Sequence, residues 1–152
     1  MKKLLLASVL SIVPAILLAQ VTVTDPWVRA TVPAQKATGA FMQLSSKTDA
    51  RLVEASSPGL RTEIHEMALQ DNVMRMRQLD GLDLPAGKTV ELKPGGYHVM
   101  FFDVENQIKE GDVIPLKLVF ESKDKKRETV ELKVPARGLN NAMPAKNSHS
   151  GH

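Results

Sequence analysis

Six histidines and methionines between residues 63 and 102 are the side chains of this sequence best suited to bind a metal ion. They form two His-x-Met pairs with two more methionines between them: His65, Met67, Met74, Met76, His98 and Met100. Thioether sulfur is a soft, neutral donor that favours Cu(I) over Zn(II), Mg(II) or Ca(II), and imidazole adds affinity and also accepts Cu(II). The sequence therefore contains the donors of a soft-metal site, provided that the fold brings them together.

The spacing of these donors suits β-strands. Side chains at every second position of a strand share a face, so the members of each pair lie on one side of the chain. If Asp71-Asn72 is a two-residue turn, Met67 faces Met76 directly across the hairpin. If the turn is Gln70-Asp71, His65 faces Met76 instead. Either register gathers the donors of this hairpin on one face, and spacing alone leaves open whether the strand with the second histidine lies beside it.

Each of these residues also has an ordinary structural explanation. A methionine in a strand is usually core filler, and a single histidine is usually a surface or hydrogen-bonded residue. The joint pattern favours a site, because the methionines lie beside Glu66, Arg75 and Arg77 in the most polar hairpin of the chain. The sequence contains no Ser-His-Asp set, paired carboxylates, phosphate loop or dinucleotide fingerprint, so we expect a protein that is not an enzyme.

The elements that must position these donors are short strands. After residue 20 no segment keeps a 3.6-residue apolar stripe over three turns, whereas short alternating runs recur between Gly, Pro, Asn and Asp turns. This pattern predicts an all-β domain, a Greek-key sandwich or barrel of about eight to nine strands. The predicted strands are 27–32, 39–45, 51–56, 61–69, 73–79, 89–92, 97–103, 116–121 and 127–134.

The two ends of the chain differ from this domain. Residues 1–19 combine a basic start, an apolar run and a small-residue end, which predicts a cleaved secretory signal. The apolar run is too short for a comfortable membrane span and contains Pro14, so we expect no stable membrane insertion after cleavage. We expect the domain to occupy residues 20–137 and residues 138–152 to form a flexible tail that contains Met143, His149 and His152.

Charge and cysteine content exclude several classes of protein. Lys2 and Lys3 leave with the predicted signal, so the formal net charge falls from +3 to +1 and gives no support for a nucleic-acid partner. The sequence has no cysteine, which excludes disulfides, a thiolate ligand and a lipid attached at a cysteine near the cleavage site. Any metal site must therefore use histidine, methionine or carboxylate side chains.

The spacing of the donors resembles that of the PCuAC family of periplasmic copper chaperones. In that family a histidine is followed by ten residues, a methionine, twenty-one residues and His-x-Met, and both gaps recur here. The resemblance implies that His65, Met76, His98 and Met100 bind Cu(I), while Met67 and Met74 are accessory or packing residues. It extends to Trp27-Val28-Arg29, Gly39-Ala40-Phe41, Gly111-Asp112 and Val134-Pro135, and so covers nearly all of the predicted domain.

The resemblance also implies a fold, a role and a location. The fold is cupredoxin-like, and the role is delivery of copper in the periplasm to the CuA site of cytochrome c oxidase or to a partner chaperone. Some family members carry a His- and Met-bearing tail that binds Cu(II). The residues Met143, His149 and His152 resemble a short version of that tail, and a plain solubilising end explains them equally well.

Three classes of protein stay open at this point. The first is a copper chaperone, with copper buffering or uptake as a variant of it. The second is an electron-transfer cupredoxin. Its common blue form needs a cysteine thiolate, so the absence of cysteine excludes that form. The third is a metal-free β-sandwich interaction module whose methionines serve an adaptable contact surface.

Overall fold

The structure, a computed structural model, describes residues 19–138 and 140, and the described part of the chain is all-β. Its ten strands are β1 (Val21–Arg29), β2 (Ala37–Ser46), β3 (Ala50–Ser56), β4 (Arg61–Gln70), β5 (Val73–Leu79), β6 (Leu82–Leu84), β7 (Thr89–Leu92), β8 (Tyr97–Phe102), β9 (Val113–Ser122) and β10 (Arg127–Arg137). The predicted fold class is confirmed. Strand β6 was not predicted, because three residues are too few to show an alternating pattern.

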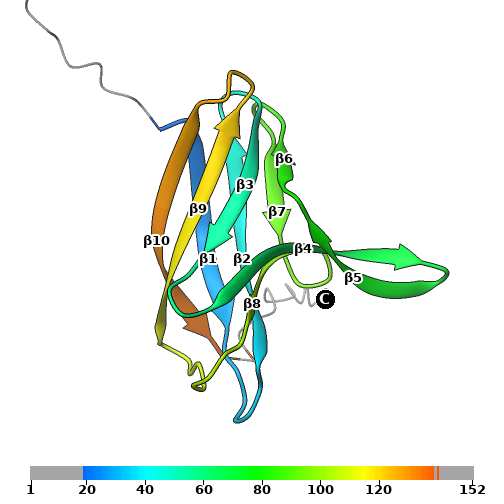
Figure 1. Cartoon of the computed structure of the whole chain (residues 1–152), viewed down its shortest axis with the longest axis vertical. Helices are drawn as coiled ribbons and strands as arrows, with labels where there is room; N and C mark the ends of the chain where they lie inside the picture. Colours follow the sequence, from blue (N-terminus) through cyan, green and yellow to red (C-terminus); the bar gives the residue numbers. More distant parts are fainter. Residues whose placement is uncertain (1–18, 139, 141–152) are drawn as a thin grey trace, which may run out of the picture.

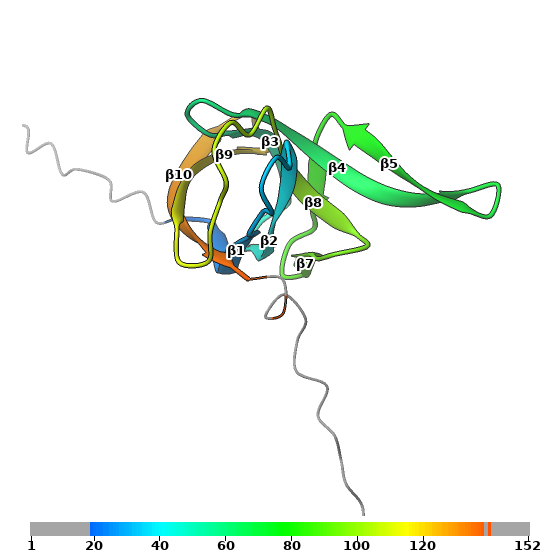
Figure 2. The same cartoon turned by 90° about the horizontal axis from the view of Figure 1, so that it is seen from below.

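The strands form one strongly curved sheet in the order β5-β4-β8-β7-β2-β1-β10-β9-β3-β6, and β8 also pairs with β2. The β1–β10 and β7–β8 pairings are parallel, and the other pairings are antiparallel. Seen end-on, the sheet wraps into a nearly closed barrel (Figure 2). The β4–β5 hairpin is the part that leaves this barrel and projects to one side (Figure 1).

The inner face of the barrel holds the main core. Its most completely buried side chains come from seven strands: Val28, Ala40, Leu44, Leu52, Leu84, Val99, Phe101, Leu118, Phe120 and Val134. Each of the larger ones contributes roughly 1.5–3 kcal/mol by leaving water. The hairpin predicted from alternation at 116–121 and 127–134 is confirmed, since β9 and β10 pair with Leu116 opposite Leu132.

A second, smaller cluster lies on the outer face. Trp27 of β1 and Phe41 of β2 are paired across the strands and almost fully buried, with ring centroids 4.6 Å apart. Gly39 makes this possible, because a Cβ at that position would lie 3.0 Å from the Phe41 ring. The outer face of the sheet therefore carries an aromatic shelf, and its position next to β8 matters for the site.

Several strand limits differ from the prediction, most of all the start of β1. β1 begins at Val21 rather than Trp27, because an irregularity between Thr24 and Trp27 interrupts the pairing and hides its alternation; Asp25 there has a φ of 49°. β10 continues through Pro135, which stands opposite Val113.

Two predictions concern parts of the chain that the structure does not describe. The signal at 1–19 and the tail at 138–152, with Met143, His149 and His152, lie almost wholly outside the described residues, so both stay predictions. Within the described residues, no helix has the length and apolar character needed to cross a membrane.

Candidate metal site

The structure brings the two histidines together. Strands β4 and β8 are antiparallel neighbours, and their register sets His65 directly opposite His98. The imidazole rings are stacked at 28° with centroids 5.9 Å apart, and each residue is 6% exposed. The spacing of the residues left open whether the strand with His98 lies beside the hairpin. The pairing of β4 with β8 shows that it does.

The β4–β5 hairpin supplies methionines to the same face. Its turn is Asp71-Asn72, with φ values of 52° and 62°, so Met67 lies opposite Met76. The first of the two predicted registers is confirmed, and the Gln70-Asp71 register is wrong. Met76 nevertheless reaches across β4, and its sulfur lies 3.4 Å from Nε2 of His98.

The other methionines on this face differ in how far they are exposed to solvent. Met100 is half-buried on β8, opposite Glu63 of β4 and Gly39 of β2, and it shares the face of His98. Met67 is half-buried, whereas Met74 is 50% exposed. The four residues selected by the resemblance therefore lie on one face of three neighbouring strands, and the other two methionines lie farther along the hairpin.

This face is the outside of the barrel. The His98 ring lies 6.2 Å from Phe41 of the aromatic shelf, and the His65 ring lies 5.7 Å from Phe102. The imidazoles are therefore shielded from water by aromatic rings while remaining separate from the main core. The two imidazoles are thus shielded from solvent and still lie close to the protein surface.

Hydrogen bonds fix which ring nitrogen of each histidine is free. Nδ1 of His98 lies 3.1 Å from the Gly96 carbonyl, which requires Nδ1 to carry the proton and leaves Nε2 free to accept a metal. Nε2 of His65 lies 2.7 Å from the Glu63 carboxylate, whereas its Nδ1 is buried and has no hydrogen-bond partner. This buried imidazole nitrogen, without a hydrogen-bond partner, is therefore free to accept a metal ion.

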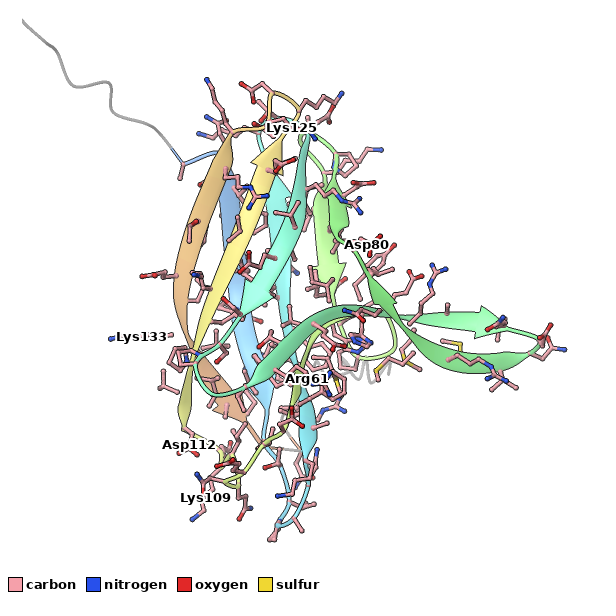
Figure 3. The ribbon with its side chains drawn as sticks, viewed as in Figure 1. Arg61, Asp80, Lys109, Asp112, Lys125 and Lys133 are labelled. Atoms are coloured by element: carbon pink, nitrogen blue, oxygen red, sulfur yellow. The ribbon has the colours of Figure 1, made fainter. Side chains whose placement is uncertain are left out.

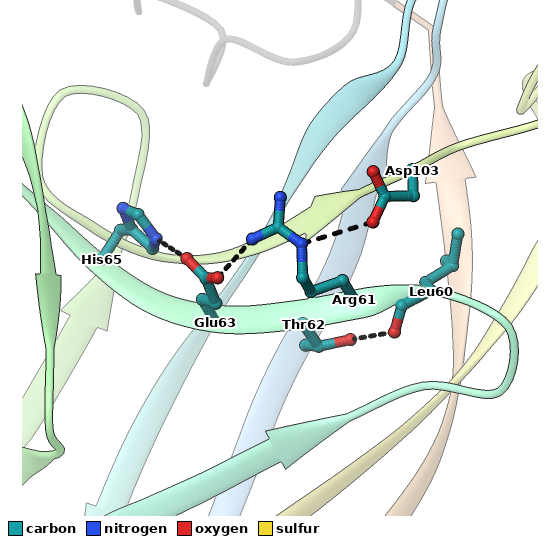
Figure 4. Close-up of polar contacts among 6 residues, drawn as sticks. All are labelled: Leu60, Arg61, Thr62, Glu63, His65 and Asp103. Atoms are coloured by element: carbon teal, nitrogen blue, oxygen red, sulfur yellow. Dashed lines mark hydrogen bonds and ion pairs between the residues drawn. The ribbon is translucent and has the colours of Figure 1, made fainter.

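A carboxylate network stands behind His65. The Glu63 carboxylate accepts hydrogen bonds from His65 and Arg61, and Arg61 also reaches Asp103 at 3.3 Å (Figure 4). The Arg61 guanidinium lies 4.1 Å above the Phe102 ring. The hydrogen bond from His65, followed by that from Arg61, holds the pKa of Glu63 below its ordinary value. The metal-binding residues predicted from the sequence did not include Glu63. Its alternation with Arg61 and His65 is the signal that could have revealed the network.

Burial sets the charge state of the second histidine. It lowers the pKa of His98 below the ordinary value, and the nearby His65 and Arg29 lower it further, against an opposing hydrogen bond to Gly96. Near neutral pH the His98 ring is therefore uncharged. Neutral imidazole is the form that binds a metal.

The donor set is unsuited to harder metals. Among residues 19–138 and 140, no group of three or more His, Cys, Asp or Glu side chains is arranged to hold a metal ion. The metal donors that this face brings together are thioether sulfur and two imidazoles. That combination favours Cu(I).

Comparison with known proteins places the chain in a family. Residues 21–136 match the LpqE-like family, described as "Putative lipoprotein LpqE-like". The chain belongs to the LpqE-like family. A Leifsonia xyli subsp. xyli protein named "Putative lipoprotein Lxx21020" is 28% identical to it over 102 residues, which cover 66% of this chain and 61% of that protein.

Solved structures with the same fold are PCuAC domains. The apo PCuAC domain from PmoF1 has a TM-score of 0.59 at 20% identity, covering 78% of the LpqE-like chain and 96% of that domain. The copper-bound PCuAC domain from PmoF2 has a TM-score of 0.58 at 23% identity, covering 78% and 95%. The Cu(I) form of DR1885 from Deinococcus radiodurans has a TM-score of 0.52 at 26% identity, covering 78% and 79%.

Proposed function

We propose that this protein binds one Cu(I) ion outside the cytoplasm and passes it to a copper-accepting protein. The ligands are His65, Met76, His98 and Met100. The observation that carries the proposal is the approach of Met76 Sδ to His98 Nε2, at 3.4 Å, on a face where His65 stands opposite His98. Support comes from its structural neighbours, among which the PmoF2 domain holds copper and DR1885 holds Cu(I).

The binding atoms follow from the hydrogen bonds. Cu(I) binds His98 through Nε2 and His65 through Nδ1, because the other nitrogens are engaged by Gly96 and Glu63. The Glu63 carboxylate then orients the His65 ring and strengthens it as a donor, as second-layer carboxylates do at metal-bound histidines. The lowered pKa of His98 and the neutrality of the thioethers let these donors bind without first losing a proton.

Transfer follows from the lability of the thioether ligands. Met76 is 44% exposed on the projecting hairpin, so an acceptor can approach the ion from that side and share it with ligands of this chain before the ion is released. The acceptor we propose is the CuA subunit of cytochrome c oxidase or another copper chaperone, in the periplasm. The lipoprotein description of the family supports an exported protein. A chelator of free Cu(I) should leave this transfer unaffected, and a block by the chelator would favour release and buffering instead.

The decisive test removes one ligand of each kind. The double variant His65→Ala/Met76→Ala should lose about 100-fold or more in Cu(I) affinity, since two of four bonds disappear. Cu(I) titration against a competing chelator measures the affinity, and X-ray absorption should show two nitrogen and two sulfur ligands in the wild type. Met42→Leu is the matched control, because Met42 lies in the main core on β2. Unchanged Cu(I) binding in the double variant contradicts the proposal.

A Cu(II) site in the tail stays a separate prediction. It uses Met143, His149 and His152, which lie outside the described residues. Truncation after residue 138 should remove Cu(II) binding and leave Cu(I) binding intact. Equal Cu(II) binding by the full and truncated chains would contradict this part.

A further inference from the structure

Beyond the histidines, the β4–β5 hairpin continues as a two-stranded arm, here defined as residues 67–76. Strand β8 pairs with β4 as far as Glu66, and the Met67 N–H then donates to the Gly96 carbonyl at 3.1 Å. Among the described strands, none besides β4 and β5 pairs with residues 68–75. Two perpendicular views show the arm projecting from the barrel (Figures 1 and 2), and the view with side chains shows sulfur atoms, in yellow, beside the arm (Figure 3). One face of the arm continues the face of the metal site.

That face is rich in sulfur. The register pairs Met67 with Met76 and Leu69 with Met74, so methionine occupies three of the four positions. Directly opposite side chains have Cβ atoms about 5 Å apart, and diagonal ones about 7–8 Å apart, within reach of long side chains. Met67 is opposite Met76 and diagonal to Met74. Three flexible thioethers can therefore converge on one ion.

Exposure argues against packing as the reason for these methionines. Met74 is 50% exposed and Met76 is 44% exposed, so neither fills a core in the described structure. A purely apolar contact face could use leucine throughout, as it does at Leu69, which is 68% exposed. Methionine differs from leucine chiefly in its polarizable sulfur. A second observation points the same way, because Met76 sulfur already contacts His98 of the copper site.

We propose that Met67, Met74 and Met76 form a second Cu(I) site, through which the ion passes between the histidines and an acceptor docked at the arm. The inference rests on the proposed copper function and adds a transfer station to it. Met76 belongs to both sites, so one ion occupies one of them at a time. The cross-strand positions place the second site about one strand repeat, roughly 7 Å, nearer the tip.

The step between the sites is a ligand exchange. The bonds from Cu(I) to His65 Nδ1, His98 Nε2 and Met100 sulfur break, those to Met67 and Met74 sulfur form, and the bond to Met76 persists. Copper stays Cu(I), and no electron moves. The imidazoles leave the ion as neutral donors and the thioethers join it as neutral donors, so the exchange itself moves no proton.

The direct experiment disables the histidine site and looks for the second one. In the variant His65→Ala/His98→Ala, Cu(I) is added anaerobically and the methionine methyl groups are followed by carbon-13 NMR. The methyl resonances of Met67, Met74 and Met76 should shift together, and X-ray absorption should show sulfur ligands. Adding Met67→Leu/Met74→Leu should abolish the Met76 shift at the same Cu(I) concentration. Unshifted Met67 and Met74 methyls overturn the proposal.

A kinetic experiment keeps the histidine site intact. In the otherwise wild-type chain, Met67→Leu/Met74→Leu keeps the apolar volume and should leave Cu(I) affinity within about threefold, while capture of the ion by excess bathocuproine disulfonate slows by about tenfold. Leu69→Ala is the matched control and should leave the capture rate unchanged. An unchanged rate in the double leucine variant, or an equal slowing in Leu69→Ala, overturns the proposal.

The two proposals fail in different ways. If the wild-type chain binds no Cu(I) through nitrogen and sulfur, the proposed function fails. If it binds Cu(I) in that way but the Met67 and Met74 variants behave like the wild type, the function stands and the arm site fails.

Discussion

The two faces of strands β4 and β8 carry opposite chemistry on one backbone. The inner face presents Ile64, Val99 and Phe101 to the core, and all three are at most 5% exposed. The outer face presents His65 and His98, which are equally buried at 6% but lie under aromatic rings instead of inside the core. Burial alone therefore does not separate structural from functional residues here. The position of a residue within its own strand does, because successive side chains of a strand point to opposite faces.

The sharpest test of this contrast compares two adjacent phenylalanines. Phe101→Ala should lower the free energy of unfolding by about 3–5 kcal/mol, because a fully buried ring leaves a cavity. Phe102→Ala, on the outer face beside Arg61 and His65, should cost less than about 1.5 kcal/mol. Urea unfolding of the two variants measures both values. Similar losses would mean that the outer face supports the fold as strongly as the core.

The next test compares two glutamates on opposite faces of β4. Glu63→Gln weakens the acceptor that holds His65, so Cu(I) affinity should fall about 10–100-fold while the fold persists. Glu66→Gln is its matched control: Glu66 pairs with Arg77 on the other face, and its loss should leave Cu(I) affinity within about twofold. Competition titrations with a Cu(I) chelator give both numbers. Equal effects would contradict the assignment of Glu63 as an orienting residue.

The local features of this contrast could be predicted from the sequence. Alternation identified nine of the ten strands, and the Asp71-Asn72 turn gave one of two possible hairpin registers. Two residues with positive φ suit a type I′ turn, which asparagine and aspartate accept. These features depend on residues close together in the chain, where period and turn chemistry act directly.

The long-range features could not be predicted in this way. The contact of His65 with His98 depends on β8 lying beside β4, and strands of an antiparallel sheet can be ordered in several ways with the same alternation. Whether the site lies outside or inside the barrel likewise depends on the direction in which the sheet curves. The aromatic shelf of Trp27 and Phe41 was missed because those residues look like core from the sequence.

The smallest expected effect concerns pH and again separates the outer face from the core. The pKa of His98 is lowered in the folded chain, so below about pH 6.5 the unfolded chain takes up a proton at this residue before the folded chain does. His98 therefore lowers the free energy of unfolding as pH falls from about 6.5 toward the lower pKa of the folded chain. Above about pH 6.5 the residue has no effect of this kind. In His98→Gln the urea midpoint of the apo protein should fall less between pH 7 and pH 5 than in the wild type.

The pKa of Glu63 is also lowered, and its stabilising contribution is lost only at lower pH, as the carboxylate is protonated below about pH 4.3. The two groups are thus distinguished by their pH windows, and Val99→Ala, a core change on the same strand, should lower the midpoint equally at both pH values. A wild-type profile that His98→Gln leaves unchanged would show that burial beneath the aromatic rings does not hold this imidazole neutral.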